Sequence, residues 1–189
     1  TFTNDAAVHL KQKLIDYIGK TGSKIHACTF HSFSQTLTMT YYIELGYSES
    51  PVIMNKADIY FLLRSRFDEL KTLRSTLFKR NPVEAIQSFQ KVFDAFRQNL
   101  LSQRELNSLQ RKELNRIGLL VEHDKIEEIY QMADMVDIYP LYQKWKKENN
   151  WIDYGDMITN LWYLIQKNID VLKILQEKYK HIIIDEFQD

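Results

Sequence analysis

The sequence has few of the residues that cross-link or punctuate a chain. Its 189 residues include one Cys, three Pro and five Gly. So little Gly and Pro argues against low complexity and against long flexible linkers. The single cysteine, Cys28, excludes an internal disulfide and is typical of a reducing compartment.

Long apolar runs are also missing. No run approaches the roughly 20 residues that cross a bilayer, and no signal peptide precedes Thr1. We therefore expect a cytoplasmic protein with no membrane partner. With 44% hydrophobic residues, the chain still has ample material for a buried core in one or two domains.

Two kinds of ligand-binding pattern are absent. The phosphate-cradling loop Gly-x-x-x-x-Gly-Lys-Ser/Thr does not occur, so we expect no residue of this sequence to bind nucleotide phosphates in that way. The histidines other than His31 lack the short paired spacing of a metal site. Cys28 falls in an apolar segment and is expected to be inert core rather than a nucleophile.

Net charge is zero, so the overall balance does not indicate a nucleic-acid partner. Locally, residues 64–80 and 97–116 are rich in Lys and Arg, whereas 122–137 are rich in Asp and Glu. Solvated helix faces are the simplest interpretation of each stretch. A basic side that contacts nucleic-acid phosphates is the alternative.

The N-terminal part is typical of a parallel α/β unit. Residues 1–3 are expected to end a strand, and Asn4 to cap a helix that extends to about Lys20. A second strand is predicted at 25–29 and a second helix at 32–45. The predicted buried face of the first helix carries Leu10, Leu14, Tyr17 and Ile18.

In the next hundred or more residues, the apolar residues recur at the spacing of an α-helix. Helix starts are indicated at Asn55, at Asn81-Pro82, at Ser102 with Glu105 three residues later, and at Asp124. Pro140 is expected to kink or split the helix that contains it. Two further helices are predicted at about 153–167 and 170–179. The fold class is therefore mostly α, with five to seven helices between two α/β segments.

The last nine residues return to a strand pattern. The apolar triplet Ile182–Ile184 followed by Asp185 and Glu186 is typical of a buried parallel strand that ends in two carboxylates. In nucleoside triphosphatases the first acid of such a pair holds Mg²⁺ and the second orients the attacking water. A core strand that ends in a solvated acidic turn is the alternative.

Three motifs in one order carry a family resemblance. Asp-Glu-Phe-Gln-Asp at 185–189 resembles the Walker B box (motif II) of UvrD/Rep-type superfamily 1A DNA helicases. Thr-Phe-Thr-Asn-x-Ala-Ala at 1–7 is similar to their motif Ia, and Thr-Phe-His-Ser at 29–32 to their motif Ib. Two weaker similarities are Val-Ile-Met-Asn at 52–55 and Asp-Tyr-Gly-Asp-Met at 153–157, although the latter could also be a simple helix N-terminus.

The resemblance implies a particular domain organisation. Residues 1–48 and 177–189 would be part of a RecA-like P-loop ATPase domain (1A) with a parallel sheet formed by 25–29 and 181–185. Residues 49–176 would be the all-helical insertion called 1B. The family's phosphate-binding loop would precede Thr1 and its second motor domain would follow Asp189. The chain is thus expected to be a fragment of a larger helicase, inactive by itself.

The resemblance also implies cofactors, partners and site residues. The parent would be an ATP-dependent DNA helicase that moves on single-stranded DNA and unwinds duplex at a junction, with ATP and Mg as cofactors. Asp185 would bind the metal, Glu186 would activate water and Gln188 would relay nucleotide state. The DNA contacts would be made by Phe2, Thr3, Asn4, Thr29, Phe30, His31 and Ser32. For Phe2 and Phe30, ordinary core packing is the alternative.

Two other functional classes remain open. A RecB- or AddA-like helicase–nuclease subunit shares these motifs and adds a nuclease domain. A helical DNA-binding or protein-interaction module without motor activity is the second alternative, favoured if the parent lacks a phosphate-binding loop. The residues that precede Thr1 in the natural protein would distinguish a motor from such a module.

Overall fold

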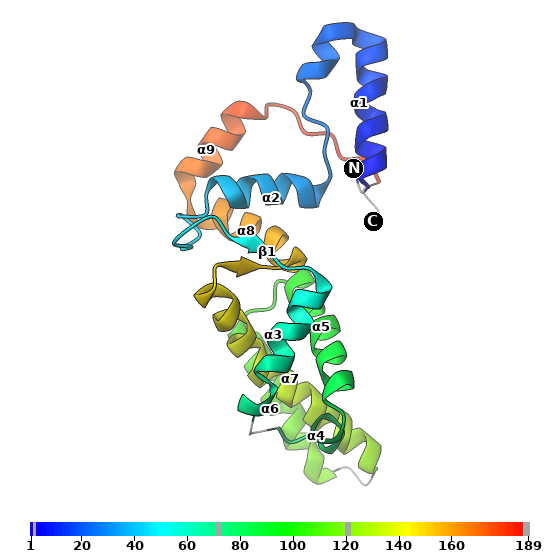
Figure 1. The fold of residues 1–189 in the computed structure, drawn as a ribbon, viewed down its shortest axis with the longest axis vertical. Helices are drawn as coiled ribbons and strands as arrows, with labels where there is room; N and C mark the ends of the chain where they lie inside the picture. The colour runs from blue at the N-terminus through cyan, green and yellow to red at the C-terminus, as the bar shows by residue number, and fades with distance from the viewer. Residues whose placement is uncertain (2, 71–72, 120–121, 187–189) are drawn as a thin grey trace. The chain divides into compact units, whose positions relative to one another are not determined.

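The computed structural model describes the chain except residues 2, 71–72, 120–121 and 187–189 (Figure 1). The chain divides into two compact units. The first unit is formed by Thr1–Ser50 together with Met157–Asp189, and the second by Pro51–Asp156. The second unit is therefore an insertion in the sequence of the first.

The described part of the first unit is helical. Its elements are α1 (Asn4–Ile18), the 3-10 helix η1 (Gly19–Lys24), α2 (Phe30–Thr40), α8 (Tyr154–Lys167) from Met157 onward, and α9 (Ile169–Lys178). Leu37, Leu164 and Val171, from α2, α8 and α9, form a small buried cluster. Because this cluster joins α8 and α9 to α2, the second boundary lies at 156/157, whereas the sequence placed it at 176/177.

Helix α1 begins one residue earlier than predicted. The Thr3 Oγ1 accepts a hydrogen bond from the Ala6 N–H at 3.1 Å, so Thr3 and not Asn4 is the N-cap. At the other end, η1 packs closely on α1, and a Cβ on Gly22 would lie 2.4 Å from the Leu14 carbonyl oxygen. Only glycine fits this approach.

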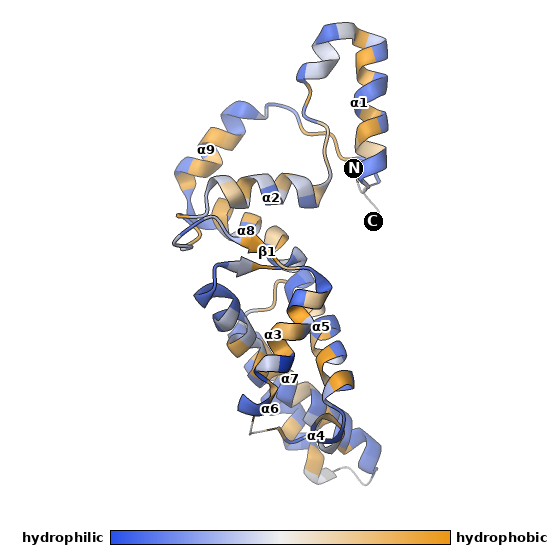
Figure 2. Ribbon diagram, in the orientation of Figure 1, coloured by the Kyte–Doolittle hydropathy of each residue, from blue (hydrophilic) through white to orange (hydrophobic). Residues whose placement is uncertain are grey.

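The predicted buried face of α1 is wrong for the described chain. Tyr17 is 86% exposed and Ile18 is 48% exposed, and Leu10 is also exposed. Hydrophobic and hydrophilic residues alternate along the helix in Figure 2, but within the described residues α1 packs mainly on η1. The pattern correctly indicated an amphipathic helix, yet no described element covers its apolar side.

The predicted strands at 25–29 and 181–185 do not form, so the expected sheet of these two segments is a wrong prediction for the described residues. The strand end predicted at 1–3 includes residue 2, which lies outside the described residues. The segments 25–29 and 181–185 are both irregular, and Ile183 is 93% exposed. A strand exists through hydrogen bonds to a neighbour, and no described segment pairs with either one. The apolar composition of these segments is visible in the sequence, but the neighbour that a strand needs is not.

The described part of the second unit is a helical bundle, as predicted. Its elements are β1 (Val52–Ile53), α3 (Lys56–Ser65), η2 (Phe67–Glu69), α4 (Thr76–Arg80), α5 (Pro82–Gln98), α6 (Gln103–Arg116), η3 (Ile117–Leu119), α7 (His123–Glu148), β2 (Trp151–Ile152) and the first turn of α8. The mostly α fold class is therefore confirmed.

A short parallel ladder joins the two ends of the second unit. Val52 pairs with Trp151 and Ile53 with Ile152. The Met54 N–H donates to the Ile152 carbonyl at 2.7 Å, which extends the ladder. The chain thus enters and leaves the second unit side by side, where the sequence indicated only a turn or an extended link near 50–55.

The predicted helix starts are mostly confirmed. Asn55 and Ser102 each form a complete capping box, and Asn81 caps α5 with Pro82 at the first helical position. Asp124 is not the cap of the acidic helix, because α7 begins at His123 after Glu122 and has no side-chain cap bond.

Pro140 does not split its helix. Residues 123–148 form one α-helix, α7, with Pro140 inside it. Proline has no N–H, so the carbonyl four residues earlier, that of Val136, loses its helical partner. The Gln103 side-chain amide donates to this carbonyl at 3.3 Å. A neighbouring helix therefore satisfies the group that proline leaves unpaired.

The core of the second unit is aromatic. Phe89 and Phe93 on α5 are fully buried, with ring centroids 5.9 Å apart. Phe78 meets Phe89 edge-on at 5.1 Å, and Tyr142 of α7 stacks on Phe93 at 5.2 Å. Aromatic pairs of this geometry stabilise by about 0.5–1.5 kcal/mol each beyond their burial. This row of rings fixes α5 against α4 and α7.

Candidate nucleic-acid interface and acidic pair

The first unit brings the two predicted DNA motifs together. The Ser32 Oγ donates to the Asn4 Oδ1 at 3.5 Å, across 28 residues of sequence. Thr29 Oγ1 lies 2.9 Å from the Ser32 Oγ and accepts from the Ser32 N–H at 3.1 Å, which makes Thr29 the N-cap of α2. The N-terminal amine of Thr1 donates to the Cys28 carbonyl at 3.2 Å.

Two helix N-termini meet at this junction. Helix α1 begins after Thr3 and α2 after Thr29. The first turns of helices present unpaired N–H groups and a partial positive charge, and both attract phosphate. Neither first turn carries Lys or Arg. Phosphate attraction at the junction would therefore come from backbone amides and polar side chains.

The residues of this junction differ in exposure. Thr29 is buried, Ser32 is half-buried, and Thr3, Asn4 and His31 are exposed. Phe30 is 49% exposed, which does not fit the core interpretation of this ring. An exposed ring beside an imidazole and hydroxyls can stack on a base while its neighbours bond to phosphate oxygens. Phe2 and Gln188 lie outside the described residues.

The predicted acidic pair is exposed at a bend. Asp185 and Glu186 follow the irregular residues 181–184 rather than a strand. The Glu186 backbone has φ 54°, a left-handed conformation that is costly for a residue with a side chain. Its N–H donates to the Asp185 Oδ1 at 3.1 Å, which orients that carboxylate.

The acidic pair offers oxygen ligands that suit Mg²⁺, but only part of a coordination shell. No group of three His, Cys, Asp or Glu side chains placed to hold a metal occurs within the described residues. Mg²⁺ commonly takes one or two carboxylates, with phosphates and water completing the octahedron. The pair therefore fits an ion that arrives with a nucleotide.

Cys28 precedes the α2 cap and is half-buried. Burial raises the pKa of its thiol. A thiol with a raised pKa is a poor nucleophile at neutral pH. The expectation that Cys28 is unreactive agrees with this environment.

The Asp-Tyr-Gly-Asp segment of the second unit is more than a helix start. Asp153 and Asp156 cap α8 reciprocally, each accepting the other's N–H, at 3.1 and 2.8 Å. Both carboxylates are buried, and they lie against two buried cations, Arg97 and Lys146. These two acidic and two basic side chains form a buried set of ion pairs, here called the buried charge network.

Asp153 is the centre of the buried charge network. Its Oδ2 accepts from the Arg97 guanidinium at 2.9 Å, the Lys146 ammonium at 2.8 Å and the Tyr142 hydroxyl at 2.5 Å. Burial opposes ionisation of Asp153, but the attraction of Lys146 and Arg97 outweighs it and lowers the pKa to about 2. Burial and the neighbouring Asp153 carboxylate raise the pKa of Tyr142 above its ordinary range.

Gly155 is required by this network. A Cβ at this position would lie 2.2 Å from the Arg97 Nε and 2.8 Å from its Cζ. Because Arg97 is held on several sides, we expect Gly155→Ala to lower the free energy of unfolding by roughly 1–3 kcal/mol. Urea unfolding followed by tryptophan fluorescence measures the effect. Gly118→Ala is the matched control, since a Cβ there meets nothing within 4 Å; equal losses in both variants would contradict the steric argument.

A second pair of structural acids, the buried Asp134 and the half-buried Glu127, was missed by sequence reasoning. Asp134 in the acidic stretch of α7 is buried and accepts from the backbone N–H groups of Arg74 and Ser75 at 2.8–2.9 Å. Glu127 accepts from the Ser75 hydroxyl at 2.5 Å and the Leu77 N–H at 3.0 Å. The acidic stretch therefore holds the start of α4 in place rather than forming only a solvated face.

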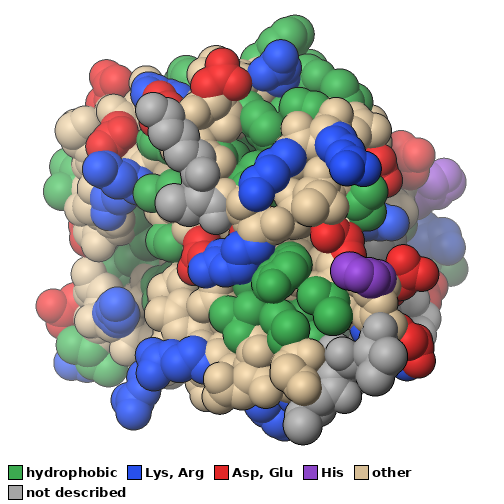
Figure 3. All heavy atoms as spheres, turned by 90° about the horizontal axis from the view of Figure 1, so that it is seen from below, with side chains coloured by type: hydrophobic (Ala, Val, Ile, Leu, Met, Phe, Trp, Pro, Cys, Tyr) green, Lys and Arg blue, Asp and Glu red, His purple; other side chains and the backbone are tan. Residues whose placement is uncertain are grey.

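The local charge biases of the sequence partly neutralise one another. Arg74 of the first basic stretch pairs with Asp137 of the acidic stretch at 2.6 Å. On the face drawn in Figure 3, acidic and basic side chains are interspersed. Three exposed cations on α6 are Arg104, Arg111 and Lys112. Arg111 and Lys112 follow Arg104 by seven and eight residues, about two helical turns, so the three lie on one side of the helix.

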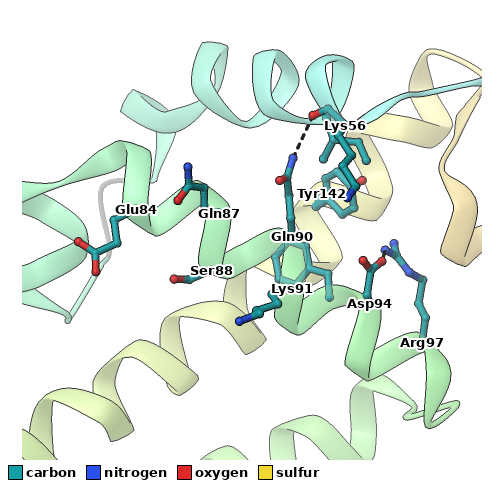
Figure 4. A pocket seen from close by; sticks show the side chains of 11 residues that line it. Lys56, Glu84, Gln87, Ser88, Gln90, Lys91, Asp94, Arg97 and Tyr142 are labelled. Carbon is teal, nitrogen blue, oxygen red and sulfur yellow. Dashed lines mark hydrogen bonds and ion pairs between the residues drawn. The ribbon is translucent and has the colours of Figure 1, made fainter.

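A cavity of about 450 Å³ lies in the second unit beside α3 and α5 (Figure 4). Lys56, Lys91 and Asp94 are among its polar lining residues, and Phe93 and Tyr142 contribute ring surface. The Gln90 amide donates to the Lys56 carbonyl at 3.2 Å. Within the described residues, none of the predicted DNA or metal residues lines this cavity.

Comparison with known proteins agrees with the motif order. The model of the UvrD/REP helicase N-terminal domain family matches residues 1–189, the full length of the chain. The chain therefore belongs to the UvrD/REP helicase family, as a sequence of its N-terminal domain. In the described residues, no helix is long and apolar enough to cross a membrane.

Individual relatives support the same assignment. The ATP-dependent DNA helicase srs2 of Schizosaccharomyces pombe is 28% identical over 191 residues, which cover 100% of this chain and 20% of srs2. The ATP-dependent DNA helicase PcrA of Bacillus subtilis is 25% identical over 189 residues, covering 100% of this chain and 22% of PcrA. The exonuclease/helicase subunit RexA of Lactococcus lactis is 30% identical over 112 residues, 56% of this chain and 9% of RexA. The chain spans about a fifth of the first two relatives.

Proposed function

We propose that this chain is part of an ATP-dependent motor that moves along single-stranded DNA and separates duplex. The observation that carries the proposal is the junction of Asn4 with Thr29 and Ser32, where two helix N-termini meet beside an exposed Phe30 and His31. Two relatives that match across this entire chain bear the name ATP-dependent DNA helicase.

The DNA strand would be held at this junction by complementary contacts. Phe30, and Phe2 on the other motif, would stack on bases, at about 1–3 kcal/mol per base. Thr3, Asn4, His31 and Ser32 would bond to phosphate oxygens, together with the N–H groups of the first turns. Thr29, which is buried, would act by fixing the start of α2.

The acidic pair would serve ATP hydrolysis. A bound Mg²⁺ would neutralise charge on the nucleotide phosphates. Asp185 would hold this ion through a carboxylate whose orientation is set by the Glu186 N–H. Glu186 would accept a proton from the attacking water, and Gln188 would respond to nucleotide state. Since no phosphate-cradling loop occurs in these 189 residues, we expect the isolated chain to lack DNA-stimulated ATPase activity.

The uncovered apolar surfaces support a larger assembly of the first unit. Ile182–Ile184 and the outer side of α1 carry exposed branched and aromatic residues, including Tyr17. Exposed apolar groups of this kind are often covered by another part of a functional protein. We propose that the rest of a RecA-like domain (1A) covers these surfaces in the parent, and that the second unit is the helical domain 1B.

A helicase–nuclease subunit is the second candidate. The match to RexA, whose name includes an exonuclease, favours it, but that match covers 56% of this chain whereas srs2 and PcrA match 100%. The two candidates share the motor and differ in a nuclease domain elsewhere in the parent. A test of the purified parent for magnesium-dependent DNA degradation distinguishes them.

The DNA-binding proposal predicts different effects for two variants of the full-length protein. We expect Phe2→Ala to weaken single-strand binding by the stacking contribution, about 1–3 kcal/mol, with little change in the salt slope. His31→Ala should act mainly through a lost phosphate contact. Fluorescence anisotropy with labelled single strands at several salt concentrations measures both. His9→Ala, an exposed histidine of α1, is the control; if both test variants match this control in affinity and in DNA-stimulated ATPase, the motifs are only packing elements.

A further inference from the structure

A three-ring cluster joins two parts of the first unit that are far apart in sequence. The His26 Nδ1 lies within hydrogen-bond distance, 2.9 Å, of the Tyr179 hydroxyl, and the two rings stack with centroids 5.9 Å apart at 27°. Phe33 meets the Tyr179 ring edge-on at 5.5 Å and lies 6.0 Å from the His26 ring. The contact spans 153 residues, with the entire second unit between its partners in the chain.

The three rings come from segments next to the predicted DNA motif and the predicted acidic pair. His26 stands three residues before Thr29, the cap of α2, and Phe33 lies in the first turns of that helix. Tyr179 is the C-cap of α9, and the irregular chain from there leads to Asp185. The cluster therefore connects the base of the DNA motif at 29–32 with the segment that carries the acidic pair.

We propose that His26 and Tyr179 are positioning residues that couple the acidic pair to the DNA motif, an inference that rests on the proposed function. A displacement of Asp185 when nucleotide binds would be transmitted along the short connection to Tyr179. The hydrogen bond and the stacked rings would carry it to His26 and to the start of α2. DNA bound at that helix start would bias the acidic pair by the same contact, because coupling between sites is reciprocal.

The geometry suits this role better than it suits simple packing. His26 is exposed and Tyr179 is half-buried, and of the three rings only Phe33 packs against the buried cluster of Leu37, Leu164 and Val171. The contact joins irregular segments, which can move without breaking a helix. A directional hydrogen bond between two such segments transmits a shift in position, whereas an apolar contact would allow them to slide.

The test uses the full-length protein and Tyr179→Phe, which removes the hydroxyl and keeps the ring contacts. Steady-state ATPase is measured with and without single-stranded DNA. We expect the stimulation by DNA to fall about fivefold or more, the lower end of typical coupling, with basal turnover unchanged. Tyr17→Phe on α1 is the matched control, because that hydroxyl is exposed and the ring is 86% accessible.

A double-variant cycle separates coupling from structure. His26→Phe keeps a ring but cannot bond to the hydroxyl, so His26→Phe with Tyr179→Phe should lose no more stimulation than either single variant. The inference is overturned if Tyr179→Phe leaves stimulation intact, if basal turnover and stimulated turnover fall together, or if the two losses add. The wild-type protein is assayed first. If it has no DNA-stimulated ATPase activity, the proposed function is overturned as well, and this result is known before any variant is made.

Discussion

Glu186→Gln in the full-length protein is expected to lower ATP turnover by about 10²–10⁴-fold, since the substitution removes the proton acceptor for the attacking water. Nucleotide binding should be retained, because the Asp185 carboxylate that we assign to the metal is unchanged. The left-handed backbone at Glu186, with φ 54°, is a property of the main chain, and glutamine has the same backbone preference. Steady-state ATPase and equilibrium binding of a fluorescent ATP analogue measure the two quantities separately.

The control for this variant is Glu177→Gln on α9, the same chemical change at an exposed position of the same unit. It should leave both quantities unchanged. Loss of nucleotide binding together with turnover in Glu186→Gln would mean that the side chain holds the nucleotide or the metal. Normal turnover would remove Glu186 from catalysis altogether.

Helix positions in this chain were predictable because their signals are local. Asn55, Asn81 and Ser102 each bond to N–H groups two or three residues ahead, so the sequence contains both partners of the interaction. The expected sheet was not predictable in the same way. Residues 182–184 have the composition of a buried strand, but a strand also needs a neighbour, and none of the described segments provides it.

Buried charges were beyond sequence reasoning for a related reason. Asp134 lies in a stretch of acids that, by composition, is a solvated helix face. Its burial depends on Arg74 and Ser75, about 60 residues away. The acids at 153 and 156 were noticed only through a family resemblance and as a helix start. Their partners Arg97 and Lys146 come from two other helices, which no spacing rule brings together.

The arrangement of the DNA motif residues was partly predictable from the sequence. The sequence predicted that the motifs at 1–7 and 29–32 belong together, and the hydrogen bond from Ser32 to Asn4 places them side by side. The described contact is between the starts of two helices. Their contacts with DNA remain a prediction.

The second large effect is expected from Asp153→Asn in the second unit. This change leaves Arg97 and Lys146 with one buried carboxylate, that of Asp156, and breaking a buried pair in this way costs about 3–5 kcal/mol. Urea unfolding of the chain, followed by the fluorescence of Trp145 and Trp151 in a Trp162→Phe background, measures the loss in this unit. Asp94→Asn is the control, because its side chain pairs with the same Arg97 but is 56% exposed, so the loss should stay below about 1 kcal/mol.

A compensating variant and an acid titration test the electrostatic origin of this loss. Lys146→Met added to Asp153→Asn removes the uncompensated cation and should recover part of the stability, as coupled residues do in a double-variant cycle. Because attraction to Lys146 and Arg97 holds the pKa of Asp153 at about 2, below its ordinary 3.8, the carboxylate contributes fully above about pH 4. That contribution is lost as the pH falls toward 2. The difference in the free energy of unfolding between wild type and Asp153→Asn should therefore become smaller over this range. If this difference in the free energy of unfolding stays constant down to pH 2, and the double variant regains no stability, the loss comes from packing instead of charge.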